Sequence, residues 1–182
     1  MIGAILAVAI STASMPSKAE CSPSSLAACR NTNQLIWNAQ FQPAIWRFLG
    51  FRRAAFLGRR TFVADQIIEV LGGPPDPPQK IGALYRFTAC RAHSCDEKGV
   101  AVLDADGRID ALGILHTACA HRHPANDCFA HVTLNLFMRR PNAQQDVIAS
   151  LSHWAKSEIA RAYTAAGMPA ERWEGVQVEA VH

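Results

Sequence analysis

The sequence predicts an α+β domain in which helices pack against an antiparallel β-sheet of about five strands. Apolar residues recur at helical spacing near both ends of the chain, and strand-like segments lie between them. The links between these segments are short, as antiparallel neighbours require. With 182 residues, 49% hydrophobic and 18% charged, the chain is long enough for one domain with a sizeable core. A formal net charge of +3 is too small to indicate a nucleic-acid partner.

Residues 1–19 are predicted to be a signal peptide, and residues 20–182 a single domain. The apolar run Ile2–Ile10 is followed by small residues that offer cleavage sites after Ala13 or Ala19. The run is much shorter than the ~20 apolar residues of a membrane span, so no membrane span is expected. Charged residues next to Cys21 argue against a lipoprotein signal. We therefore expect an exported protein.

Six cysteines suit an oxidising compartment, where they can pair. They fall into three couples that are local in sequence: Cys21/Cys29, Cys90/Cys95 and Cys119/Cys128. Pairing within each couple is the simplest of the connectivities that six cysteines allow. A Cys90–Cys95 bridge would close a loop of about six residues, worth about 2 kcal/mol, so its expected role is to fix the local backbone.

The first predicted helix is Trp37–Leu49, with Pro43 in or near its first turn and Gly50 as the stop signal. The following segment, Phe51–Arg60, carries four arginines. A solvated surface is the favoured interpretation of these arginines, and a phosphate-binding patch is the alternative.

The middle of the chain is predicted to form strands. Gln66–Leu71 is short and rich in β-branched residues, and the glycines and prolines of residues 72–78 predict a loop after it. The next predicted strands are Ile81–Ala89, Val100–Leu103, Ile109–Leu115 and Val132–Met138. Asp104–Gly107 is predicted to be a hairpin turn with glycine in the left-handed conformation.

A long helix is predicted after the strands. Asn142 and Gln145 resemble a capping box, and Gly167 and Pro169 would end the helix. Its apolar stripe consists of Val147, Leu151, Trp154, Ala155, Ile159, Tyr163 and Ala166. Val176–Val181 is predicted as a last strand.

The segment Cys90–Cys95 carries the most functional information. If its cysteines are bridged, Arg91, Ala92, His93 and Ser94 must project as a tight loop, with His93 near the apex. Such a protruding loop is shaped to enter a cleft, whereas the reactive groups of an enzyme line a concavity. The simplest alternative is that the bridge is only a staple and His93 an exposed loop residue.

The segment Tyr85–Cys95, together with Gly99–Val102 and Leu112–Thr117, resembles the Ivy family, the inhibitors of vertebrate lysozyme. These bacterial periplasmic proteins carry a C-K-P-H-D-C loop at the same place. Trp37–Trp46 is similar, more loosely, to the first helix of the family. The resemblance covers residues 37–117 and fades afterwards.

The resemblance implies a periplasmic, non-enzymatic protein with neither cofactor nor metal, and the family includes homodimers. The loop would enter the active site of a C-type lysozyme, where His93 would hydrogen-bond the acid and the ionised carboxylate that such glycosidases need. The sequence departs from the family loop at three positions: Arg91 replaces Lys but keeps its positive charge, Ala92 replaces Pro, and Ser94 replaces Asp. We therefore expect weaker inhibition or a different target muramidase.

Two alternatives remain at this stage. A related target is the cell's own lytic transglycosylases, whose clefts hold a catalytic acid without a partner carboxylate. A periplasmic metal-binding module could instead use the 119–128 segment, whose ligand types are Cys119, His121, His123, Asp127 and Cys128. A disulfide-closed loop is the favoured interpretation of that segment. A hydrolase is not predicted, because the sequence shows no recognisable nucleophile or carboxylate pair.

Overall fold

The computed structural model describes residues 20–117, 131–167 and 173–181, and it confirms an α+β fold. The helical elements are η1 (Pro23–Ala28), α1 (Thr32–Ile36), α2 (Phe41–Leu49), α3 (Val63–Leu71), η3 (Pro141–Ala143) and α4 (Gln145–Ala165). The strands are β1 (Arg53–Ala54), β2 (Thr61–Phe62), β3 (Gln79–Ile81), β4 (Leu84–Arg91), β5 (Ser94–Leu103), β6 (Ile109–His116), β7 (Val132–Met138) and β8 (Trp173–Ala180).

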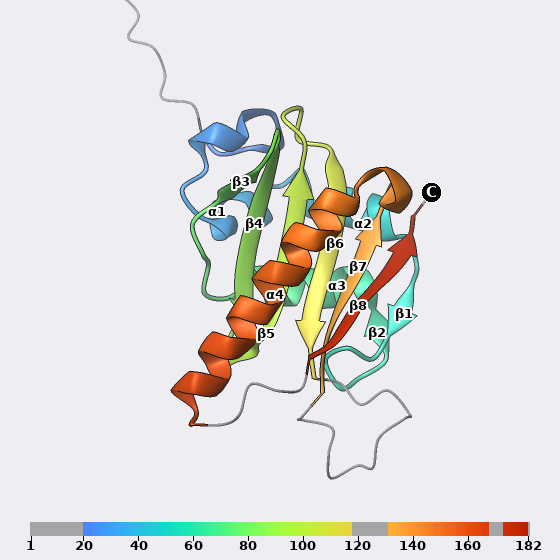
Figure 1. The fold of residues 1–182 in the computed structure, drawn as a ribbon. Coiled ribbons are helices and arrows are strands. Elements are labelled where there is room, and N and C mark those ends of the chain that lie inside the picture. The colour runs from blue at the N-terminus through green and yellow to red at the C-terminus, as the bar shows by residue number, and fades with distance from the viewer. Residues whose placement is uncertain (1–19, 118–130, 168–172, 182) are drawn as a thin grey trace, which may run out of the picture.

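The main sheet has six strands in the order β3-β4-β5-β6-β7-β8, and a separate small sheet joins β1 and β2. Helices cover both faces of the main sheet, α4 on one and α1–α3 on the other (Figure 1). The expectation of a purely antiparallel sheet is corrected at one edge, because β8 runs parallel to β7. The 21-residue helix α4 lies between them in sequence and returns the chain to the end where β7 began.

The core therefore has two parts, one on each face of the sheet. Leu35, Ile45, Ile67 and Leu112 belong to the cluster between α1–α3 and the sheet. The second cluster, under α4, includes six of the seven residues predicted as the apolar stripe of that helix: Val147, Leu151, Trp154, Ala155, Ile159 and Tyr163. Ala166, the seventh, is exposed at the C-cap.

The predicted helix Trp37–Leu49 is divided in two. Trp37 is the C-cap of α1, and α2 begins at Phe41 with Pro43 in its first turn, where a missing N–H costs nothing. Gly50, with φ of 63°, ends α2 as expected. The capping box predicted at Asn142 is wrong, because Asn142 lies in η3 and α4 begins at Gln145 without a side-chain cap.

The prediction of a strand at Gln66–Leu71 is wrong, because these residues belong to helix α3. Val63, Ile67 and Val70 are fully or almost fully buried and lie on one helical face at spacings of four and three. Burial of that face against the sheet outweighs the preference of β-branched residues for strands.

The remaining strands are confirmed with changed bounds. The predicted strand Ile81–Ala89 is interrupted at Gly82, whose φ of 58° forms the turn between β3 and β4. The predicted strand Val100–Leu103 begins earlier, at Ser94, and the turn before β6 places Gly107 at φ 76° as expected. A Cβ on Gly107 would lie 1.9 Å from the carbonyl oxygen of Pro23, so η1 packs against this turn.

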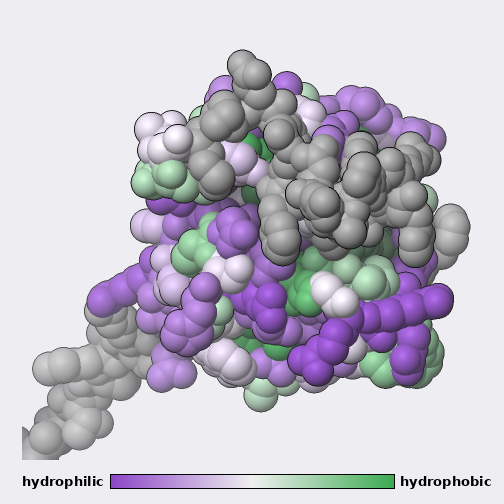
Figure 2. All heavy atoms as spheres, turned by 90° about the horizontal axis from the view of Figure 1, so that it is seen from below, coloured by the Kyte–Doolittle hydropathy of each residue, from purple (hydrophilic) through white to green (hydrophobic). Residues whose placement is uncertain are grey.

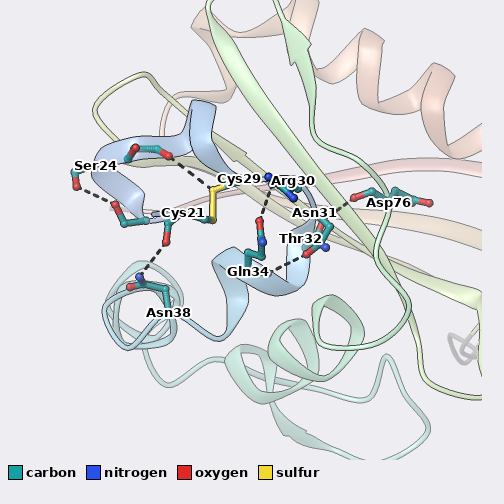
Figure 3. The surroundings of a disulfide bond; sticks show 11 residues. Cys21, Ser24, Cys29, Arg30, Asn31, Thr32, Gln34, Asn38 and Asp76 are labelled. Carbon is teal, nitrogen blue, oxygen red and sulfur yellow. Dashed lines mark hydrogen bonds between the residues drawn. A yellow bond between two sulfur atoms is a disulfide. The ribbon is translucent and has the colours of Figure 1, made fainter. Parts of the chain in front are cut away.

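Cys21 and Cys29 are joined by a disulfide around η1, as predicted (Figure 3). Asn31 caps α1 by accepting from the Gln34 N–H at 3.1 Å. The buried Thr32 hydroxyl then donates to the Thr88 carbonyl at 2.6 Å, which fastens this N-terminal region to β4. The predicted pair Cys119/Cys128 lies outside the described residues. Within the described ranges, no helix has the length and apolar character needed to cross a membrane.

Candidate functional site: the hairpin closed by Cys90 and Cys95

The β4–β5 hairpin turns through two residues, Ala92 and His93, at one end of the sheet. Arg91 pairs with Ser94 across the turn, and a disulfide joins Cys90 to Cys95, as predicted. The pairing register then shifts, because Cys90 pairs with Lys98. Cys95, Asp96 and Glu97 thus form a bulge on β5, and the disulfide holds this irregular hairpin together at its base.

His93 lies at the turn with φ of 67°, and it is the one non-glycine residue with positive φ among the described residues. Histidine adopts this left-handed conformation more readily than β-branched residues do, and a tight hairpin turn needs it. The side chain is exposed, and no hydrogen bond, ion pair or ring contact engages it in the described part of the chain. The imidazole is therefore presented to solvent.

Arg91, which stands where the Ivy loop has Lys, is paired with two carboxylates. Its Nε donates to Glu69 Oε1 of α3, and its Nη1 donates to Glu97 Oε2 of β5, both at 2.7 Å. The hydrogen bond with Glu97 is the main reason why the pKa of Arg91 is raised above its usual value. The guanidinium thus clamps the hairpin to α3, and its charge is balanced within the molecule.

Ser94 stands where the Ivy loop has Asp, yet a carboxylate lies next to it. Ser94 Oγ donates to Asp96 Oδ1 at 2.8 Å. Together with Glu69 and Glu97, which share the Arg91 guanidinium, Asp96 gives the hairpin an acidic flank of three carboxylates against one cation. A flank of this charge favours approach of a basic partner.

The loop before β3 braces the base of the hairpin. Cys90 N–H donates to the Pro74 carbonyl at 3.0 Å, and Asp76 N–H donates to the Thr88 carbonyl at 2.9 Å. A Cβ on Gly73 would lie 2.0 Å from the Cys90 carbonyl oxygen, so only glycine permits this close approach. The glycine and the prolines of this loop therefore have a structural role in holding the site.

A groove of about 490 Å³ lies beside the disulfide, between the hairpin, the Pro74–Asp76 loop and the C-terminal part of α4. Its lining combines apolar groups from both cysteines, the prolines and two alanines of α4 with the charged side chains of Asp76, Asp96, Lys98, Glu158 and Arg161. Figure 2 views the molecule from below, toward this end of the sheet, and shows hydrophobic surface sunk among hydrophilic groups. The hairpin thus projects next to a hollow.

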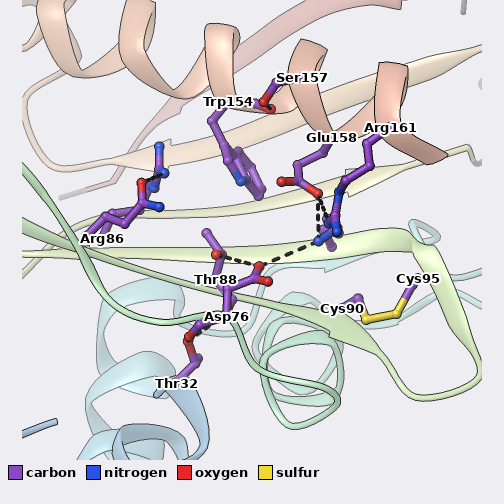
Figure 4. A network of polar contacts seen from close by, with 12 residues as sticks. Thr32, Asp76, Arg86, Thr88, Cys90, Cys95, Trp154, Ser157, Glu158 and Arg161 are labelled. Carbon is purple, nitrogen blue, oxygen red and sulfur yellow. Dashed lines mark hydrogen bonds and ion pairs between the residues drawn. A yellow bond between two sulfur atoms is a disulfide. The ribbon is translucent and has the colours of Figure 1, made fainter. Parts of the chain in front are cut away.

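A charged network forms the floor of the groove (Figure 4). Lys98 has a side chain only 5% exposed, and its Nζ lies 2.8 Å from Glu158 Oε2 and 3.5 Å from Asp76 Oδ2. Asp76 also accepts from the Thr88 hydroxyl at 2.8 Å, and Arg161 pairs with Glu158. The buried Lys98 cation thus meets two carboxylates, and the more exposed Arg161 adds a second cation to Glu158.

Burial acts to raise the pKa of Glu158, but hydrogen bonds from Lys98 and Arg161 outweigh it and leave that pKa below its usual value. The sequence analysis missed Lys98, Asp76, Glu158 and Arg161. Spacing reveals only the pair Glu158/Arg161, three residues apart on a helix. The other contacts join separate segments, so only the fold brings them together.

The metal-binding alternative has no support within the described residues, where no cluster of three or more His, Cys, Asp or Glu side chains could hold a metal ion. Its candidate ligands Cys119, His121, His123, Asp127 and Cys128 lie outside the described residues. His116, which precedes them, is 6% exposed and contacts Asn135 Oδ1 through Nε2 at 2.8 Å. Its ring also packs on Phe56, with centroids 4.7 Å apart.

Comparisons with known proteins found no matching family model, and no significant match among curated proteins or solved structures. The similarity to the Ivy family therefore consists of the hairpin motif and its neighbouring segments.

Proposed function

We propose that this chain is a periplasmic inhibitor of a C-type lysozyme that blocks the active-site cleft with the Cys90–Cys95 hairpin. The observation that carries the proposal is His93, an exposed imidazole with no partner among the described residues, at the turn of a disulfide-closed hairpin. The Ivy-like motif agrees with this role.

The chemistry follows from the two carboxyl groups of the target. A protonated imidazole donates a hydrogen bond from each ring nitrogen, so one side chain can engage both groups. Bonds of this charge-assisted kind contribute ~1.5–3 kcal/mol each. Because the left-handed turn and the disulfide already fix the hairpin, little conformational entropy is lost when it enters the cleft.

Electrostatics at the hairpin favour a basic target. The chain as a whole carries a formal net charge of +3, which gives no long-range attraction to a cation. In the acidic flank, Glu69, Asp96 and Glu97 outnumber the one cation Arg91, and this excess of negative charge would attract a basic target locally at the hairpin.

The test is lysis of a bacterial cell-wall suspension by a C-type lysozyme, followed as loss of turbidity with and without the purified chain. The proposal expects stoichiometric slowing of lysis, and unchanged lysis at excess chain would overturn it. Repeating the assay with a lytic transglycosylase separates the two targets. Inhibition of the transglycosylase alone would assign the protein to control of cell-wall remodelling and not to defence.

A further inference from the structure

The arginine-rich segment after α2 forms a surface that the hairpin does not use. Phe51 is 84% exposed, the highest value among the exposed large hydrophobic residues of the described chain. The Phe51 ring packs edge-on against Trp46, with centroids 6.4 Å apart, and against Phe62, with centroids 6.2 Å apart. The Trp46 and Phe62 rings are themselves 5.2 Å apart. The three rings form a cluster whose outermost member stands in water.

Arginines surround this ring cluster. Arg53 lies over the Phe62 ring, with its Cζ 3.9 Å from the centroid, and Arg59 and Arg60 are exposed in the connection between β1 and β2. Arg52 donates to the Leu49 carbonyl at 2.6 Å and pairs with Glu179 of β8. Glu179 thus pairs with Arg52, whereas Arg53, Arg59 and Arg60 form no ion pair within the described residues.

The surface is preorganised by a buried glutamine. Gln66, 2% exposed, accepts from the Leu57 N–H at 3.0 Å and donates to the Ala54 carbonyl at 2.9 Å. The same Nε2 contacts the Thr61 carbonyl at 3.3 Å. One side chain thus holds both strands of the β1–β2 hairpin and the connection that carries Arg59 and Arg60.

We infer that this aromatic–arginine surface binds the anionic phospholipid headgroups of a membrane. Peripheral membrane sites combine cations, which pair with headgroup phosphates, with an exposed aromatic ring that enters the boundary just below them. Phe51, in the turn between α2 and β1, and the arginines that follow it present that combination at the surface.

The position of the surface leaves the Cys90–Cys95 hairpin free. Glu179 places it at the β8 edge of the sheet, where Figure 1 also shows β1 and β2. Strand β4 lies four positions away in the sheet order, about 19 Å at normal strand spacing. The aromatic–arginine surface and the Cys90–Cys95 hairpin thus belong to different strands of the sheet, and this inference stands without the proposed inhibitory function.

Co-sedimentation with vesicles tests the inference. Vesicles containing phosphatidylglycerol are compared with pure phosphatidylcholine vesicles, at low and at high salt. We expect binding to the anionic vesicles that weakens as salt rises, and a loss of about tenfold or more for Phe51→Ser and for the double variant Arg53→Gln/Arg60→Gln. All variants carry the same N-terminal segment, so any contribution from its apolar run is common to them.

Two matched controls make the test specific. Trp37→Ser removes another aromatic side chain, 63% exposed, and Lys156→Gln removes an exposed cation from α4 on the opposite face. Both should bind as the unchanged chain does. Equal binding to both vesicle types, unchanged binding by Phe51→Ser, or an equal loss in Trp37→Ser would overturn the inference, as would a preference for nucleic acid or acidic protein over the anionic vesicles.

Discussion

Arg91 Nε lies 2.7 Å from Glu69 Oε1, so the residue before the hairpin turn is fastened to helix α3. A second bond, to Glu97, fixes the same guanidinium against β5. The Ivy loop has a lysine at the position of Arg91. Because both ion pairs hold the residue before the turn, we expect Arg91 to position the hairpin that carries His93.

A double-mutant cycle tests this positioning role. Exposed ion pairs contribute up to ~1 kcal/mol each, so Arg91→Gln should weaken inhibition about fivefold. Glu69→Gln, which leaves the hairpin untouched, should weaken it about twofold, and the double variant should be no weaker than Arg91→Gln alone. Inhibition constants for the four proteins measure the coupling.

Asp65→Asn is the matched control, because it removes one negative charge from the same helix without breaking the clamp. Additive losses from Arg91→Gln and Glu69→Gln would show that the arginine meets the target directly.

The two disulfides of the described chain allow a comparison within one molecule. Replacing Cys90 and Cys95 by serine should lower the unfolding free energy by about 2 kcal/mol and weaken inhibition at least tenfold, because the hairpin gains conformations that do not fit the cleft. Replacing Cys21 and Cys29 by serine should cost a similar ~2–3 kcal/mol but leave inhibition unchanged, since that bridge closes around η1.

Denaturant unfolding and the lysis assay measure the two effects separately. Equal loss of inhibition in both pairs would indicate that global stability, and not the shape of the hairpin, controls activity.

Much of the fold could be predicted because periodicity records burial. The stripe of α4 and the apolar alternation of β7 both mark residues of the cluster under α4, although β7 is also buried on its other face. The prediction of a strand at Gln66–Leu71 was wrong because a window of six residues is too short to separate a buried helical turn from a strand. The β-branched residues Ile67, Ile68 and Val70 favoured the strand. The parallel pairing of β8 was missed because sequence adjacency favours antiparallel neighbours, whereas α4 permits a crossover.

The site was predictable only where it is local in sequence. Cys90, His93 and Cys95 lie within six positions, so the disulfide and the turn that it closes could be predicted together. The partners of Arg91 and Lys98 lie on other elements, and no spacing rule connects Lys98 to Asp76 and Glu158. These contacts result from sheet topology and from the packing of α4.

Lys98 should contribute to stability through its two carboxylate partners. Lys98→Met leaves Glu158 with Arg161 alone and Asp76 without its cation, and it should lower the unfolding free energy by about 2–3 kcal/mol. This is less than for a fully buried pair, because the Asp76 side chain is 36% exposed. Chemical denaturation measures the unfolding free energy of Lys98→Met, with Lys156→Met on the exposed face of α4 as the control.

Adding Glu158→Gln to Lys98→Met should recover part of the loss, because it removes a half-buried carboxylate that has lost one of its two cations. Stability of Lys98→Met equal to that of the unchanged chain would show that the network contributes nothing.

His116 should make stability depend on pH. Burial lowers its pKa in the folded chain, whereas in the unfolded chain the pKa stands near the usual ~6.5. The unfolded state therefore binds the proton first, and stability falls as pH drops through ~6.5 toward the lower folded pKa. Between pH 7.5 and 5.5 the loss should reach up to about 1.4 kcal/mol.

His116→Gln should flatten this part of the pH profile, whereas His153→Gln, on the exposed face of α4, should leave it unchanged. Denaturant midpoints across the range provide the measurement. An undiminished slope in His116→Gln would assign the pH dependence to other groups.

The most direct test of the proposed function is the affinity of His93→Ala for a C-type lysozyme, measured by calorimetric titration beside His153→Ala. Because the His93 side chain is exposed and without a partner in the described chain, its removal should leave the unfolding free energy unchanged. We predict a dissociation constant at least tenfold weaker for His93→Ala and unaltered for His153→Ala. Equal affinities of His93→Ala and the unchanged chain would contradict the proposal that this imidazole blocks the cleft.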